Sequence, residues 1–165
     1  MFLKRFFAII FAFFVVNRIK RSYCKAAEIQ KNTLKNLIEK AKDTSFGIDH
    51  NFDEIKNHED FTTRVPIRDY EQIKKYIERI KKGELDILWP GKPKYLAKTS
   101  GTTSGVKQIP ITNESLPNHI LSARNALLFY IYETRKTKFL NGKTIFIQGS
   151  PSLKRINGIL EGRLS

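Results

Sequence analysis

The chain has 165 residues, of which 41% are hydrophobic and 28% charged, and 30 Lys and Arg against 16 Asp and Glu give a formal net charge of +14. These proportions are close to those of ordinary globular domains and exclude a disordered or collagen-like chain. A single cysteine, Cys24, excludes an intramolecular disulfide framework and a cysteine-rich zinc site, so we expect a basic globular protein of the cytoplasm.

The positive charge is spread along the chain and does not gather in one nucleic-acid-binding motif. Its densest clusters, in residues 18–25, 74–82 and 135–138, lie beside helical patterns whose apolar residues occupy another face. That arrangement is typical of a solvated helix surface. We therefore expect no specific nucleic-acid partner. Non-specific binding of nucleic acid, with an affinity that falls steeply with salt, stays an alternative.

Residues Phe6 to Val16 form an unbroken apolar run between basic residues. Eleven helical residues extend over about 16 Å, whereas the hydrocarbon core of a bilayer is about 30 Å thick, so the run is too short to cross a membrane. The basic sequence that follows, Asn17 to Arg21, lacks the small residues of a signal-peptide cleavage site. We expect a first helix that packs into the core or lies on the surface. A signal or membrane-surface anchor stays an alternative, because the run contains five phenylalanines.

A second helix is predicted over Ala26 to Ala41, where apolar residues recur at helical spacing. The positions that share its apolar face are Leu34, Leu37, Ile38 and Ala41. Residues 43–47 have the composition of a turn, which predicts the end of this helix there. Residues 47–65 are polar with scattered aromatic residues, so we expect them to be mostly irregular.

A third helix is predicted to begin at Asp69, an N-cap residue with Gln72 three positions later, which is the spacing of a capping box. Its expected apolar stripe is made of Tyr70, Ile73, Ile77 and Ile80. Gly83 is expected to end it. The short apolar stretch from Leu85 to Trp89 stops at a Pro-Gly pair.

The last elements follow the order strand, loop, helix, strand. A strand is predicted at Tyr95 to Ala97 and another at residues 144–148. Between them a long helix is expected, capped by Thr112 or Asn113 and with Pro117 in or near its first turn. The expected buried face of the helix is Leu116, Ile120, Ala123, Leu127, Tyr130, Ile131 and Thr134. This order indicates a βαβ unit, and hence an α/β fold with a parallel-rich sheet that binds ligands at the carboxyl ends of its strands.

The loop of this unit carries the clearest chemical signal. From Thr99 to Gly105 every side chain is a hydroxyl-bearing group or a hydrogen atom, and Lys107 follows. Such a segment buries nothing, but its backbone N–H groups, hydroxyls and ammonium group suit a phosphate. The spacing fits neither the Walker A motif nor the dinucleotide fingerprint. A Gly/Ser/Thr linker without a ligand is the alternative.

The segment resembles the phosphate-binding loop of the adenylate-forming superfamily: two small residues, Gly, two Ser or Thr, a small residue, any residue, an aliphatic residue or proline, and Lys. Its surroundings resemble, more narrowly, the Gretchen Hagen auxin-responsive family of acyl acid–amido synthetases. The stretches that carry this likeness are residues 44–47, 59–71, 83–89, 99–110, 149–152 and 158–165. The likeness covers most of the chain after about residue 28, and the first 25 residues carry none.

The resemblance implies an ATP-dependent ligase, which joins a carboxylic acid to ATP as an acyl-adenylate and transfers the acyl group to an amino acid. ATP and Mg²⁺ would be its cofactors, and a small carboxylic acid and an amino acid its substrates. It implies that the phosphates are bound by Thr99, Ser100, Gly101, Thr102, Thr103, Ser104, Gly105 and Lys107. Lys107 would offset the charge of the leaving pyrophosphate, a role that we class as catalytic. Metal ligands stay unassigned.

Family members run to several hundred residues, so this chain is expected to be the N-terminal portion of an adenylate-forming domain, inactive by itself. We divide it into an apolar and basic helix, residues 1–25, and an incomplete acyl-activating domain, residues 26–165. The acid, the amine acceptor and the choice between amide and thioester cannot be read from this portion. The alternative function is a short basic protein that binds membrane surfaces through residues 1–21.

Overall fold

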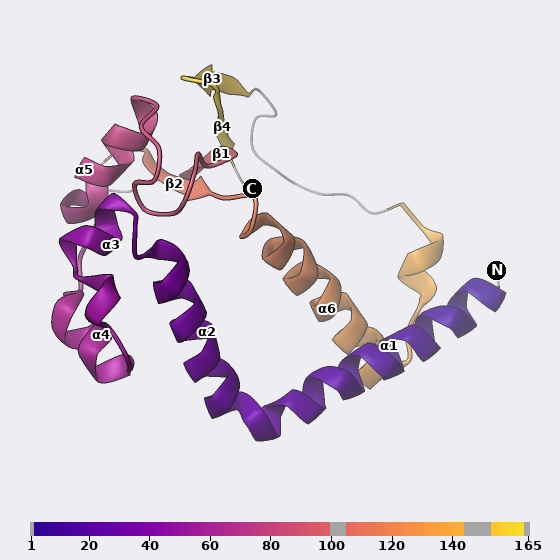
Figure 1. Ribbon diagram of the computed structural model, residues 1–165. Helices are drawn as coiled ribbons and strands as arrows, with labels where there is room; N and C mark the ends of the chain where they lie inside the picture. Colours follow the sequence, from indigo (N-terminus) through magenta and orange to yellow (C-terminus); the bar gives the residue numbers. More distant parts are fainter. Residues whose placement is uncertain (1, 100–104, 144–152, 164–165) are drawn as a thin grey trace. The chain divides into compact units, whose positions relative to one another are not determined.

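The computed structural model describes residues 2–99, 105–143 and 153–163 (Figure 1). The chain forms two compact units. The first comprises Met1–Ala27 and Glu114–Ile147, and the second comprises Glu28–Asn113 and Gln148–Ser165.

Every regular element in the described residues of the first unit is a helix. The unit contains α1 (Phe2–Ser22), the 3-10 helix η1 (Tyr23–Lys25), α6 (Leu116–Thr134) and the 3-10 helix η3 (Lys138–Asn141). Its core joins α1 to α6 through Ala12, Val16, Leu128 and Ile131, all buried. Lys20 on α1 pairs with Glu133 on α6 at 3.1 Å. The predicted first helix is therefore confirmed, and one of its faces packs in a core.

The buried face predicted for α6 is largely wrong. Leu128 and Ile131 are buried, whereas Ile120, Leu127 and Tyr130 are exposed. The helix carries apolar side chains around most of its circumference, so periodicity alone does not select a face. Its N-cap residue is Ser115, not Thr112 or Asn113, while Pro117 does lie in the first turn.

The second unit begins with four α-helices and a 3-10 turn: α2 (Ala26–Ala41), α3 (Ser45–Asp49), η2 (Phe52–Glu54), α4 (His58–Arg64) and α5 (Tyr70–Lys81). Two predictions needed correction here. Residues 43–47 are not only a turn, because the helix α3 already begins at Ser45. Thr44 caps this helix by accepting a hydrogen bond from the Gly47 amide at 3.0 Å. Residues 47–65 are not mostly irregular, because Asn57 caps α4 in the same way through the Asp60 amide. Both caps satisfy amides that a helix start leaves unpaired.

The prediction for α5 is confirmed at its start. The Asp69 side chain accepts from the Gln72 amide at 3.0 Å, and the Gln72 side chain accepts from the Asp69 amide at 2.9 Å, a complete capping box. Tyr76, Ile77 and Ile80 are its buried residues. Tyr76 was missed by the predicted stripe; its hydroxyl donates to Asp49 at 2.5 Å. Burial, followed by this carboxylate, raises the pKa of Tyr76.

In the described residues the sheet has four strands, β1 (Tyr95–Thr99), β2 (Lys107–Ile111), β3 (Lys154–Ile156) and β4 (Ile159–Arg163), in the order β2-β1-β4-β3. β1 pairs parallel with β4, while the β1–β2 and β3–β4 pairs are antiparallel. The α/β class and the strand predicted at Tyr95 to Ala97 are confirmed. The described sheet is mixed rather than parallel-rich, with one parallel and two antiparallel pairs. In chain order α6 falls between the parallel strands β1 and β4, whereas the strand predicted at 144–148 lies outside the described residues.

The β3–β4 hairpin was not predicted, although its turn has a strong sequence signal. Asn157 and Gly158 form a two-residue turn with φ of 47° and 82° between the paired residues Ile156 and Ile159. Positive φ at both central residues is the geometry that Asn-Gly turns favour. The Asn157 side-chain amide also donates to the Lys81 carbonyl at the end of α5, at 2.7 Å.

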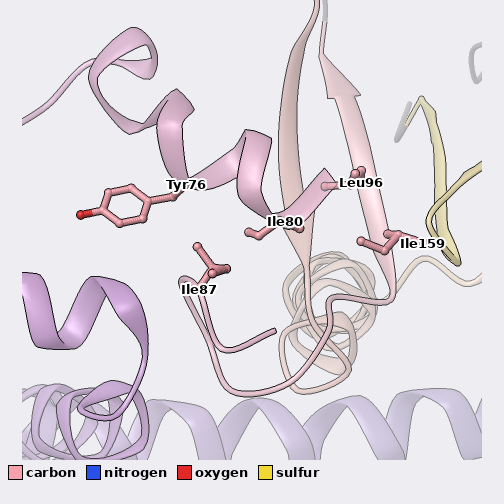
Figure 2. Close-up of a cluster of buried hydrophobic side chains, with 5 residues drawn as sticks. All are labelled: Tyr76, Ile80, Ile87, Leu96 and Ile159. Carbon is pink, nitrogen blue, oxygen red and sulfur yellow. The ribbon is translucent and has the colours of Figure 1, made fainter. Parts of the chain in front are cut away.

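Two apolar clusters hold the second unit together. In one of them, side chains of α5 and of the segment after it pack against β1 and β4 (Figure 2). Its buried members are Tyr76, Ile80, Ile87, Leu96 and Ile159. The other cluster joins the end of α2 to the following turns through Ile38, Ala41, Phe52 and Ile55, with Trp89 packed against them. The first cluster anchors β1, the strand that leads into the candidate loop, against α5 and β4.

Candidate functional site

The candidate phosphate loop connects two antiparallel neighbours. Thr99, the last residue of β1, pairs directly with Lys107, the first residue of β2. Both ends of the predicted motif are thus brought together at one end of a hairpin. The five residues Ser100, Gly101, Thr102, Thr103 and Ser104 lie outside the described part of the chain.

The last residues of the loop are open to solvent. Gly105 is exposed, and a side chain built on it would meet no atom within 4 Å. Its φ is +81°, in the left-handed region that favours glycine, so the backbone conformation and not a lack of space explains this residue. Val106 is also exposed.

Lys107 lies beside an aromatic side chain of α5. Its Nζ atom is 5.7 Å from the centre of the Tyr70 ring, which is within the range of a cation–π contact. The Tyr70 hydroxyl accepts a hydrogen bond from the Gln108 amide at 2.9 Å. Tyr70 therefore contacts two consecutive residues of β2, and its ring borders the space available to the Lys107 ammonium group.

A buried carboxylate on β4 contacts the residues on both sides of the loop. Glu161 is only 4% exposed, and its Oε2 atom pairs with the Nζ of Lys98 at 2.6 Å. Its Oε1 atom accepts a hydrogen bond from the side-chain amide of Gln108. We call Lys98, Gln108 and Glu161 the Glu161 network. The register places Lys98 opposite Gln108 on neighbouring strands, which brings the two side chains onto the same face.

Sequence reasoning missed Glu161, Gln108 and Tyr70 as site residues. Tyr70 was assigned only to a helical stripe, and nothing in the spacing of Gln108 and Glu161 indicates that they meet. They are 53 positions apart, and the parallel pairing of β1 with β4 joins them. A carboxylate between two uncharged neighbours, as Glu161 is between Leu160 and Gly162, is the one signal that could have drawn attention to it.

The chemistry of the arrangement suits an anion more than a metal ion. Lys107 offers a positive charge at the end of a glycine- and hydroxyl-rich connection. Both oxygens of Glu161 already have partners. Among the residues that the structure describes, no group of three or more His, Cys, Asp or Glu could hold a metal ion.

The chain is similar to known proteins over most of its length. The family model described as the GH3 family N-terminal domain matches residues 15–159. The chain belongs to the GH3 family. This confirms the Gretchen Hagen resemblance, and it corrects one of its limits: the match begins at residue 15 and so includes the end of the apolar run in α1. The division at residue 25 stays a prediction.

Curated GH3 relatives are amido synthetases. The chain is 28% identical over 143 residues to jasmonoyl–L-amino acid synthetase JAR4 of Nicotiana attenuata, covering 83% of this chain and 24% of the relative. It is 34% identical over 123 residues to indole-3-acetic acid-amido synthetase GH3.15 of Arabidopsis thaliana, covering 62% of this chain and 20% of the relative. The chain therefore spans about a quarter or less of the length of these relatives.

A solved structure shares the fold. The structure of AtGH3.15 acyl acid amido synthetase in complex with 2,4-DB matches with a TM-score of 0.68 and 25% sequence identity, over 82% of this chain and 24% of that one. In the described part of this chain, no helix is both long enough and apolar enough to cross a membrane.

Proposed function

We propose that this chain supplies the ATP-phosphate-binding part of an acyl acid–amido synthetase. The observation that carries the proposal is the pairing of Thr99 with Lys107, which closes the family's phosphate loop at the end of a hairpin in a chain of the GH3 family. A cytoplasmic location belongs to the same proposal, since ATP and free amino acids are available there.

The proposed reaction has two steps. A carboxylate oxygen of the acid attacks the α-phosphorus of ATP, the bond to the β-phosphate breaks, and pyrophosphate leaves. The nitrogen of an amino acid then attacks the acyl carbon, the bond from that carbon to the AMP oxygen breaks, and AMP leaves while the nitrogen releases one proton to solvent as the amide forms. In the first step the Lys107 ammonium group would offset the negative charge that gathers on the leaving pyrophosphate, which lowers the barrier without any covalent bond to the enzyme.

The phosphate-binding groups are proposed to be those of the loop. Thr99, Ser100, Gly101, Thr102, Thr103, Ser104 and Gly105 would offer backbone N–H groups and hydroxyls to the β- and γ-phosphates. We propose Mg²⁺ as the counter-ion of ATP rather than as an ion held by the described side chains, because both oxygens of Glu161 are engaged. Since the chain spans about a quarter of the length of its relatives, we propose that it does not complete a turnover alone.

Titration of the 165-residue chain with MgATP tests the proposal. We expect binding, and we expect Lys107→Ala to weaken it about tenfold, which corresponds to the loss of one charge-assisted contact to phosphate. Isothermal titration calorimetry at one fixed ionic strength measures both affinities. Lys107→Arg should keep most of the affinity because it keeps the charge.

The matched control for this titration is Lys35→Ala. Lys35 is an exposed residue of α2 in the same unit, so its removal changes the net charge by the same amount without touching the loop or the strands that carry it. An equal loss of affinity in both alanine variants would reduce the role of Lys107 to general surface charge. No loss in Lys107→Ala would refute the assignment of the loop.

A second candidate function, contact with an anionic membrane surface, is favoured by a specific feature of α1. Large apolar side chains lie exposed along this helix: Leu3, Phe6, Phe7, Phe11, Phe13 and Phe14. The helix also carries basic residues near both ends, including Lys4, Arg5, Arg18 and Arg21. Apolar side chains between cationic groups are typical of helices that lie in the headgroup region of a bilayer.

Flotation with vesicles tests this second candidate. We expect the chain to float with vesicles of 30% phosphatidylserine in phosphatidylcholine, and to float several-fold less after Phe7→Ser with Phe14→Ser, residues that are 59% and 67% exposed. Leu37→Ser on α2 is the control for loss of an exposed apolar residue. Equal flotation of the double variant and the wild type would exclude α1 as the contact.

A further inference from the structure

Two members of the Glu161 network directly border the candidate loop. Lys98 is the residue immediately before the candidate motif Thr99 to Lys107, and Gln108 is the residue immediately after it. One carboxylate binds both of them, with one oxygen for each. The two residues that border the motif are thus tied to a third strand, and not only to each other.

Because Glu161 is buried, its contacts with Lys98 and Gln108 require defined positions of these two side chains. A carboxylate that is 4% exposed has lost most of its hydration, so it needs an opposite charge or hydrogen-bond donors at defined positions. Glu161 has one of each. Gln108 is itself buried and is held from its other side, since its backbone amide donates to Tyr70. A shift of either strand end would leave a buried polar atom without its partner.

A negative charge next to a phosphate loop is unfavourable for anion binding if it acts through the field alone. Lys98 pairs with Glu161 at 2.6 Å and offsets much of this charge, so the geometry of its two contacts, and not its field, is what Glu161 offers the loop. The ammonium group of Lys98 is paired with Glu161 and is therefore less available to bind phosphate. Lys107 lies at the other end of the motif, beside Tyr70.

We propose that Glu161 is a positioning residue for the phosphate loop: through Lys98 and Gln108 it fixes both strand ends from which the loop starts and returns. This inference rests on the proposed function, because it assigns Glu161 to the same phosphate site. Glu161 does not touch the phosphate. It restricts the separation and direction of the two strand ends, and so holds Thr99 and Lys107 in place before phosphate binds.

The test is a titration of the 165-residue chain with inorganic tripolyphosphate and Mg²⁺, a probe that needs no adenine site. We expect Glu161→Gln to weaken binding about tenfold, as is common when a residue that orients a ligand-binding group is lost. The direction of the change is decisive. If Glu161 acted only through its charge, its neutralisation would strengthen binding of the anion, so equal or tighter binding would overturn the proposal.

Glu84→Gln is the matched control. Glu84 pairs with Arg79 at 2.7 Å near the end of α5 opposite to Tyr70, so this variant removes the same charge from an ion pair of the same unit. We expect it to leave tripolyphosphate binding within twofold of the wild type. A loss as large as that of Glu161→Gln would also overturn the proposal, because it would show a general effect of charge.

Amide hydrogen exchange separates positioning from a purely structural role. In Glu161→Gln we expect the Gln108 amide, which donates to Tyr70, to exchange at least several-fold faster, while the Lys82 amide at the end of α5 keeps its rate. Equal acceleration of both amides would mean a loss of overall stability and would overturn the proposal.

A second variant covers the case in which Glu161→Gln does not fold. Gln108→Met removes the donor to Glu161 but leaves the Lys98–Glu161 pair in place. We expect it to weaken tripolyphosphate binding about threefold, since one strand end is released. A wild-type chain that binds no tripolyphosphate would refute the proposed function together with this inference, whereas binding that neither variant weakens would refute this inference alone.

Discussion

Replacing Leu96 with alanine is expected to lower the free energy of unfolding of the second unit by about 3 kcal/mol. Leu96 is completely buried, and it contacts a cluster that draws on α5, the segment after it, and β4 (Figure 2). The substitution removes apolar contacts and leaves a cavity between elements that are fixed by strand pairing on one side and by the helix on the other. The surrounding residues can therefore relax only in part.

Urea denaturation followed by the fluorescence of Trp89 measures this loss. Trp89 is the single tryptophan of the chain and packs in the second unit, so its signal reports that unit. Leu85→Ala is the control, because Leu85 is more than half exposed and its truncation should cost less than about 1 kcal/mol. Similar losses in the two variants would contradict the packing of Leu96.

Replacing Gly47 with alanine is expected to cost about as much, near 3 kcal/mol, by the opposite mechanism. A Cβ atom at this position would lie 2.1 Å from the Ala41 carbonyl oxygen and 2.7 Å from that of Lys42. These are backbone atoms at the end of α2, which cannot rotate away as a side chain can. The same carbonyl of Ala41 accepts a hydrogen bond from the buried Thr44 hydroxyl at 2.7 Å, so moving it would disturb the cap of α3.

The control for Gly47→Ala is Gly91→Ala in the same unit. Gly91 has a φ of +75° and open space around it, so alanine there should cost about 1 kcal/mol through its backbone conformation alone. The same Trp89 denaturation measures both. If Gly47→Ala proved no worse than Gly91→Ala, the close approach of Gly47 to α2 would be wrong.

Features that depend on neighbouring residues could be predicted from the sequence. The capping box of Asp69 and Gln72 and the strand at Tyr95 to Ala97 are encoded within a few positions, and both were found where expected. The candidate phosphate motif is conspicuous in the sequence because its composition excludes a packing role, and its binding of phosphate stays a prediction. Its ends, Thr99 and Lys107, meet as paired residues, although the sequence alone did not indicate a hairpin.

Features that depend on distant contacts could not be predicted. Periodicity could not select the packed face of α6, because its apolar side chains surround the helix. Glu161 gave no sign of its place near the loop, since the sequence does not state that β4 pairs with β1. The missed hairpin at Asn157 and Gly158 is different: its turn signal was present in the sequence and was overlooked.

Family-typical stretches now have physical reasons in this chain. Gly47 belongs to one of them, and the structure leaves no room there for a side chain. Tyr70 belongs to another, and it contacts both Lys107 and Gln108. These are requirements of space and hydrogen bonding, which composition and periodicity do not reveal.

The 53 positions between Gln108 and Glu161 also have a consequence for the order in which this unit folds. Contacts between near neighbours in sequence form sooner than contacts that must close a long segment, since closure costs more entropy as the segment lengthens. The β1–β2 hairpin is local, whereas β4 joins it across a segment that includes all of α6. We therefore expect the hairpin to form early during synthesis or refolding, and the proposed phosphate site to be completed only in a later step, when β4 pairs with β1.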